Sequence, residues 1–125
     1  MPEPIQVRLQ YSAIGLRPGH DVADVVHGVR TMLRLGVECF LVADAAGGLE
    51  PTWAPGDLMI VTDHLNIMYH HPLVGPNEES LGTRFPDMTN AYDAGLRAAL
   101  AGVAKEAGIA LREGVYAGLL GPSCE

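Results

Sequence analysis

The chain contains few cysteines and few charged residues, and neither set forms a recognisable chemical pattern. Its only cysteines, Cys39 and Cys124, are too far apart in the sequence for a CxxC motif. This excludes a disulfide framework or a cysteine-based zinc site as the basis of the fold. Charged residues make up 18% of the 125 residues and hydrophobic residues 48%, a composition that excludes an intrinsically disordered chain.

Basic residues are also scarce, and they form no stripe. The chain has 8 Lys and Arg against 15 Asp and Glu, a formal net charge of −7, whereas a nucleic-acid-binding surface is normally basic. No apolar run approaches the roughly 18 residues of a membrane-spanning helix, and the first residues lack the basic start and apolar core of a signal peptide. We therefore expect a cytoplasmic protein that binds a small molecule or another protein, with no nucleic-acid or membrane partner.

Two segments carry the apolar periodicity of helices. Apolar residues recur at helical spacing over about residues 22–35 and 93–107, and we expect a helix in each place. Asp21 and Asp93 are suited to cap these helices. The apolar residues that mark the second helix are Leu96, Ala99, Leu100, Val103 and Ala107.

Four other segments have the patterns of strands. Residues 5–10 alternate between apolar and polar, which is typical of a half-buried strand. Continuous apolar runs at 39–43 and 58–61 predict strands covered on both faces, and a fourth strand is expected over 114–120. Residues 66–90 show no periodicity, and a connection of this length is usually functional or part of an interface. Strands that alternate with helices indicate an α/β fold.

A run of small residues, Ala45-Ala46-Gly47-Gly48, follows the predicted strand at 39–43. Small side chains let backbone N–H groups approach a ligand closely, and ligands of α/β sheets bind beyond the carboxyl ends of strands. The run is therefore a candidate ligand-binding segment. A tight turn is the alternative explanation.

The histidines and one aromatic residue are the other candidates. None of the five histidines has a carboxylate at a recognisable metal-ligand spacing, so we expect no metal site. His64 follows Asp63 at a strand end, and we expect it to be a hydrogen-bonded structural residue rather than a base. Phe85 is unusual in a polar loop, where it either packs beneath the loop or covers the pocket of a neighbouring molecule.

Several motifs together resemble those of the trimeric (low-molecular-mass) purine nucleoside phosphorylases. Asp44-Ala45-Ala46-Gly47-Gly48-Leu49 is similar to the family's Asn-Ala-Ala-Gly-Gly-Leu, and Gly121-Pro122-Ser123-Cys124-Glu125 is similar to its Gly-Pro-Ser-Tyr/Phe-Glu. Further motifs in the family's order are Gly56-Asp57-Leu58-Met59, Asp63-His64-Leu65-Asn66, Pro72-Leu73-Val74-Gly75-Pro76-Asn77, Arg84-Phe85-Pro86-Asp87-Met88, Ala91-Tyr92-Asp93 and Glu113-Gly114-Val115-Tyr116.

The resemblance covers about residues 19–125 and implies both a fold and an activity. The fold is α/β, a partial three-layer phosphorylase/hydrolase-like fold with a mixed, largely buried β-sheet and helices on both faces. Residues 1–125 would form a single, incomplete nucleoside phosphorylase domain. The activity is phosphorolysis of purine ribo- or deoxyribonucleosides to free base and (deoxy)ribose 1-phosphate, a pentosyltransferase reaction of purine salvage. Inorganic phosphate is the co-substrate, and no cofactor is implied.

The resemblance also assigns roles to individual residues. Glu125 is implied as the catalytic residue, a hydrogen-bond partner for the purine on which negative charge develops. Phe85 would close the sugar pocket of the neighbouring subunit in a homotrimer, and Cys124 stands where an aromatic residue normally stacks on the base. The implied substrate-binding residues are Ala45, Ala46, Gly47, Phe85, Cys124 and Glu125, and the implied phosphate-binding residues are Asp44 and Ala45.

Several positions depart from the family pattern. Ala13 and Gly15 occupy the places of a phosphate-binding Arg and His, and Arg17 could replace that Arg only through a gap in the alignment. Asp44 replaces an Asn beside the phosphate, and like charges about 4 Å apart cost roughly 4 kcal/mol at an effective dielectric constant near 20. The alternative reading is therefore a catalytically inactive fragment or degenerate relative that at most binds purines or acts as an oligomer partner. Hydrolysis by water is a weaker third reading, because no base is positioned for it.

Overall fold

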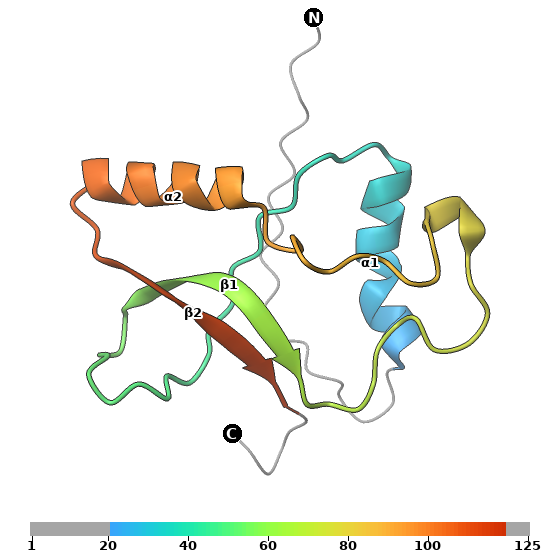
Figure 1. Cartoon of the computed structure of the whole chain (residues 1–125), viewed down its shortest axis with the longest axis horizontal. Helices are drawn as coiled ribbons and strands as arrows, with labels where there is room; N and C mark the ends of the chain where they lie inside the picture. The colour runs from blue at the N-terminus through green and yellow to red at the C-terminus, as the bar shows by residue number, and fades with distance from the viewer. Residues whose placement is uncertain (1–20, 120–125) are drawn as a thin grey trace, which may run out of the picture. The chain divides into compact units, whose positions relative to one another are not determined.

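The computed structural model describes residues 21–119 (Figure 1). These residues fall into two compact units. The first unit contains residues 21–47 and 70–76, and the second contains residues 48–69 and 77–119. The strand expected at 5–10 lies outside the described residues. Within residues 21–119, neither helix is both long enough and apolar enough to cross a membrane.

The first unit contains helix α1, Val22–Arg34, as the sequence predicted. Asp21 caps the helix, because its side chain accepts hydrogen bonds from the backbone N–H groups of Ala23 and Asp24. Asp24 completes a capping box by accepting the N–H of Asp21 at 3.3 Å. Gly36 follows the helix with a φ of 84°, the left-handed conformation in which many helices end.

The strand predicted at residues 39–43 is wrong. These residues have no regular structure, and Leu41 and Val42 are 67% and 68% exposed. A strand exists only where a second strand satisfies its N–H and C=O groups. Among residues 21–119, strand pairing joins only β1 and β2 of the second unit, and an apolar run by itself supplies no such partner.

The second unit contains a parallel pair of strands, β1 (Leu58–Asn66) and β2 (Leu111–Gly118). The register places Leu58 beside Leu111 and Asn66 beside Gly118, with an irregularity between Val61 and Asp63. At this irregularity the Thr62 hydroxyl donates to the Gly114 carbonyl at 3.1 Å. Both strands are present where the sequence predicted strands. However, β1 continues through polar residues to Asn66, and β2 begins and ends earlier than expected.

The connection from β1 to β2 contains a short 3-10 helix, η1 (Glu79–Leu81), and helix α2 (Ala94–Glu106). Asp93 caps α2 by accepting the Leu96 N–H at 2.8 Å. Helix α2 contacts β2, so this connection has the β-α-β form that parallel strands require. The α/β class expected from the sequence is therefore confirmed.

The apolar stripe of α2 is exposed. Leu96 is 49% exposed and Val103 is 63% exposed, whereas Ala104 is buried at 9%. Arg97 and Ala101, which share the face of Ala104, are half-buried. Helix α2 thus packs with the side of Ala104 inward and leaves the leucine and valine stripe on the outside.

The sheet is also less buried than expected. Among the residues that the structure describes, only Ile60 and Ala104 are buried hydrophobic residues. Gly114 permits the one especially tight contact at the sheet, because a Cβ there would lie 2.7 Å from Met59 Sδ and 3.5 Å from the Trp53 ring. Trp53, which is half-buried, thus packs against the middle of β2 at Gly114.

Candidate functional site

The small-residue segment that the sequence singled out is open to solvent. Residues Asp44, Ala45, Ala46 and Gly47 are exposed and form neither a helix, a strand nor a turn. A Cβ at Gly47 would meet nothing within 4 Å, so space remains beside the backbone. The alternative explanation of this run as a tight turn is therefore wrong, whereas its role in ligand binding stays a prediction.

Asp44 already occupies one N–H group of this segment. Its Oδ1 accepts the N–H of Ala45 at 2.8 Å. The resemblance assigns this N–H to the phosphate site, so a phosphate ion would have to compete with a carboxylate of the same sign. Because Asp44 is exposed, water screens this repulsion. The repulsion is consequently smaller than the roughly 4 kcal/mol expected at an effective dielectric constant near 20 and closer to the bulk-water value of about 1 kcal/mol.

Phe85 lies in the second unit, in the connection between η1 and α2. Its side chain is 84% exposed, so it does not pack beneath its own loop. Of the two explanations for an aromatic residue here, contact with another molecule remains. The structure of a single chain does not test whether Phe85 lies in a sugar pocket, or whether that pocket belongs to a neighbouring subunit. Both stay predictions.

The residues that follow Phe85 form consecutive tight turns. Asp87 Oδ1 accepts the N–H of Thr89 at 2.9 Å and its hydroxyl at 2.6 Å. These two hydrogen bonds, the hydroxyl's first, lower the pKa of Asp87 below its ordinary value. The Ala91 N–H then donates to the Met88 carbonyl at 3.2 Å. The backbone between Phe85 and α2 is thus held by local hydrogen bonds.

This segment ends at a contact between Tyr92 and strand β1. The Tyr92 hydroxyl lies 3.1 Å from His64 Nδ1, and the two rings meet edge to face with their centroids 5.7 Å apart. Arg97 Nε donates to the Tyr92 carbonyl at 3.2 Å. Burial raises the pKa of Tyr92, and the charges of Asp63 and Tyr116 raise it further. The prediction that His64 is hydrogen-bonded is confirmed, whereas its role as a structural residue rather than a base stays a prediction.

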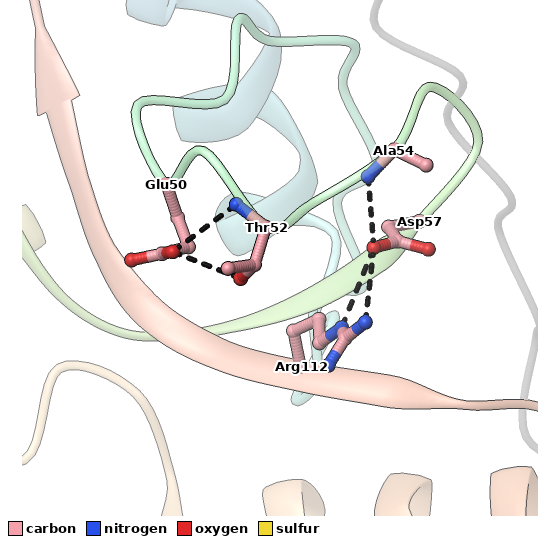
Figure 2. Close-up of polar contacts among 5 residues, drawn as sticks. All are labelled: Glu50, Thr52, Ala54, Asp57 and Arg112. Atoms are coloured by element: carbon pink, nitrogen blue, oxygen red, sulfur yellow. Dashed lines mark hydrogen bonds and ion pairs between the residues drawn. The ribbon is translucent and has the colours of Figure 1, made fainter.

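A second polar cluster lies where β1 and β2 begin (Figure 2). Asp57 Oδ2 accepts from Arg112 Nε at 3.4 Å and Nη2 at 3.3 Å, and from the Ala54 N–H at 3.2 Å. In the loop before β1, Glu50 accepts from the hydroxyl of Thr52 at 2.8 Å and from its N–H at 3.2 Å, which lowers the pKa of Glu50. The Asp57–Arg112 pair joins the starts of the two strands, so its role is structural.

Sequence reasoning missed both long-range pairs, Tyr92–His64 and Asp57–Arg112. Their members belong to motifs that carry the family resemblance or lie beside one. However, residues 28 and 55 positions apart give no sign in a single sequence that they meet. Among the candidate site residues, Cys124 and Glu125 lie outside the described residues. In residues 21–119, no group of three or more His, Cys, Asp or Glu could hold a metal ion.

Comparison with known proteins places the chain in a family. Residues 7–125 match the model of the phosphorylase superfamily. The chain belongs to the phosphorylase superfamily, and the curated relatives that it matches include purine nucleoside phosphorylases. It is 47% identical over 107 residues to purine nucleoside phosphorylase 1 of Bacillus subtilis, an alignment that covers 86% of this chain and 40% of that protein. It is 41% identical over 112 residues to the Mus musculus purine nucleoside phosphorylase, covering 86% and 39%.

Solved structures give the same result for the fold. The structure of Schistosoma mansoni purine nucleoside phosphorylase with a monocyclic inhibitor superposes with a TM-score of 0.84 at 38% identity, covering 90% of this chain and 44% of that one. The complex of the same enzyme with inosine superposes with a TM-score of 0.79, covering 87% and 40%. The partial phosphorylase fold expected from the sequence is therefore confirmed. The chain spans about 40% of the length of the curated relatives it matches.

Proposed function

We propose that this chain is part of a purine nucleoside phosphorylase, which cleaves purine ribo- or deoxyribonucleosides with inorganic phosphate and releases the free base and (deoxy)ribose 1-phosphate. The observation that carries the proposal is the 47% identity over 107 residues to a bacterial purine nucleoside phosphorylase. Structures of relatives in complex with hypoxanthine and with inosine support the same substrate class. A relative bound to ribose 1-phosphate supports phosphate as co-substrate. The proposal includes no cofactor.

The proposal assigns the chemistry to the residues that the resemblance marks. Glu125 stabilises the departing base, and backbone N–H groups from Ala45 to Gly47 approach the base and phosphate. Phe85 covers the sugar, and its 84% exposure leaves it free to do so. Its contact with a neighbouring subunit requires a homotrimer, which we include in the proposal together with a cytoplasmic location. Residues 1–125 are proposed to belong to one nucleoside phosphorylase domain.

A second function is favoured by a specific observation. The Asp44 carboxylate holds the Ala45 N–H, and the positions of the phosphate-binding Arg and His carry Ala13 and Gly15. Both features oppose phosphate binding. The second candidate is therefore a catalytically inactive relative that binds purines or serves as an oligomer partner.

Phosphate-dependent release of hypoxanthine from inosine by the purified chain tests the main proposal. The expected result is release that requires both protein and phosphate, and a rate equal to that of buffer would refute catalysis by this chain. Calorimetric titration with hypoxanthine then distinguishes the second candidate. Binding that phosphate does not enhance supports the inactive purine binder, whereas phosphate-enhanced binding contradicts it.

A further inference from the structure

Tyr92 connects the Phe85 segment to the sheet. The two residues are joined by the turns at Asp87–Thr89 and Met88–Ala91, so the backbone between them has little freedom. At the end of this path, the Tyr92 side chain reaches His64 on β1. The position of the exposed Phe85 therefore depends on the contact that attaches Tyr92 to His64 on β1.

The contact between Tyr92 and His64 is directional as well as apolar. At 3.1 Å, the hydroxyl and Nδ1 are within hydrogen-bond distance. An interplanar angle of 71° gives the edge-to-face arrangement that aromatic pairs prefer. Because burial favours the neutral form of the Tyr92 hydroxyl, the hydroxyl keeps its proton and can donate it to Nδ1 of a neutral imidazole. One edge-to-face ring contact and one hydrogen bond thus hold the tyrosine in one orientation.

The attachment also has backbone support on both sides. Asp63 Oδ1 accepts the His64 N–H at 2.8 Å, and His64 lies beside Tyr116 in the register of the two strands. On the other side, Arg97 holds the Tyr92 carbonyl and Asp93 caps α2. His64 is therefore placed by strand β1, and Tyr92 lies directly before the cap of helix α2. Attachment to regular secondary structure positions a group more accurately than a free loop does.

We propose that Tyr92 and His64 form a positioning pair that holds residues 85–91, and with them Phe85, in the orientation that binds the sugar of a nucleoside. The part of this inference that concerns the sugar rests on the proposed function. Neither residue touches the substrate. Loss of the hydrogen bond affects ligands that carry a sugar and leaves the binding of a free base unchanged.

Tyr92→Phe is the main test, because it removes the hydroxyl and keeps the ring. The matched control is Tyr69→Phe, which removes the same group from a tyrosine of the same connection that is 91% exposed. We expect Tyr92→Phe to bind inosine about threefold to tenfold more weakly, the effect of one partly buried hydrogen bond, with unchanged affinity for hypoxanthine. We also expect faster amide hydrogen exchange over residues 86–91, and Tyr69→Phe should change neither measurement.

A second pair of variants separates positioning from general loss of structure. His64→Asn keeps an acceptor where Nδ1 stands, whereas His64→Leu keeps an apolar side chain without an acceptor. We expect exchange over residues 86–91 to stay near that of the unmodified chain in His64→Asn and to increase in His64→Leu. Circular dichroism of each variant confirms that it is folded.

Two results would overturn the inference. Unchanged exchange over residues 86–91 in folded Tyr92→Phe would show that the pair does not hold the segment. Equal weakening of inosine and hypoxanthine binding would show a general structural role instead. If the unmodified chain binds neither ligand, the proposed function and the role in sugar binding fall together. The exchange measurement then decides separately whether the pair holds the segment.

Discussion

Two segments predicted to contact substrate differ in how the chain holds them. Residues 44–47 are exposed, lack regular structure, and have a hydrogen bond between adjacent residues, Ala45 and Asp44. Residues 85–93 are held by two turns, by the Tyr92–His64 pair and by the cap of α2. The first segment offers backbone groups to a ligand, and the second offers one side chain at a defined place. The residues expected to bind substrate are exposed in both segments. Only in the second segment do contacts within the described chain hold the residue in a defined position.

The largest expected effect distinguishes the two aromatic residues of the second segment. Tyr92→Ala removes a half-buried ring with its hydrogen bond and should lower the free energy of unfolding of the second unit by about 2 kcal/mol. Phe85→Ala should change it by less than about 0.5 kcal/mol, because the ring is 84% exposed. Urea unfolding measures both values. Equal losses would contradict the view that Tyr92 holds the segment and Phe85 does not.

The next effect concerns the charge of the first segment. Asp44→Asn removes an exposed negative charge beside the proposed phosphate site and should raise the affinity for inorganic phosphate about fivefold, equivalent to about 1 kcal/mol in a water-screened environment. Calorimetric titration with phosphate measures the change. Glu38→Gln, which removes another exposed negative charge of the same unit, is the control and should have a smaller effect.

The gain from Asp44→Asn should also shrink as salt is added, because salt screens exposed charges. A gain of equal size in Glu38→Gln would indicate a response to overall charge rather than to the proposed site.

A smaller effect is expected at alkaline pH. Burial raises the pKa of Tyr92 above its ordinary value of 10.0, so the folded chain keeps a proton that the unfolded chain loses. This contribution to stability is complete below about pH 10 and is lost as the pH rises through the folded-state pKa. The free energy of unfolding, measured from about pH 8 to 11, should therefore fall more steeply with pH for the unmodified chain than for Tyr92→Phe. The same pH dependence in both proteins would show that the Tyr92 hydroxyl is not desolvated.

The smallest effect is expected at Asp87. Thr89→Val removes the hydroxyl that contributes most to its lowered pKa, so the pKa should rise toward the ordinary value of 3.8. The lowered pKa stabilises the fold above about pH 4, and this contribution is lost as the pH falls through the folded-state pKa. NMR titration of the carboxyl carbons measures the change. Thr52→Val is the matched control, because it should raise the pKa of Glu50 instead and leave that of Asp87 unchanged.

The sequence predicted those parts of the fold that depend on neighbouring residues. Helices α1 and α2 follow from apolar spacing and from the caps Asp21 and Asp93, all within a few residues of one another. The strand expected at 39–43 was wrong, because pairing depends on a partner that the segment itself does not contain. The apolar spacing did not show which side of α2 packs inward, and that side carries Ala104 rather than the leucines.

In the candidate site, too, features carried by neighbouring residues could be predicted and contacts between distant residues could not. Motifs marked Asp44–Gly47 and Phe85, because residue types within a short window carry that resemblance. The hydrogen bonding of His64 followed from its place at a strand end. Its partner Tyr92 did not, because a contact across 28 positions is decided by the path of the chain between them. Functional residues can therefore be recognised from sequence more readily than the residues that hold them in place.

The single tryptophan of the chain, Trp53, has a practical consequence. It is half-buried in the second unit, next to Gly114 in the middle of β2, and its ring lies 4.0 Å from the position that a Cβ at Gly48 would occupy. Indole fluorescence excited at the red edge of its absorption therefore arises from this unit alone. The same residue also borders the small-residue segment at Gly48. The chain thus carries its own optical reporter, whose emission can follow unfolding of the second unit and can test the ligand binding proposed for that segment, without an added label.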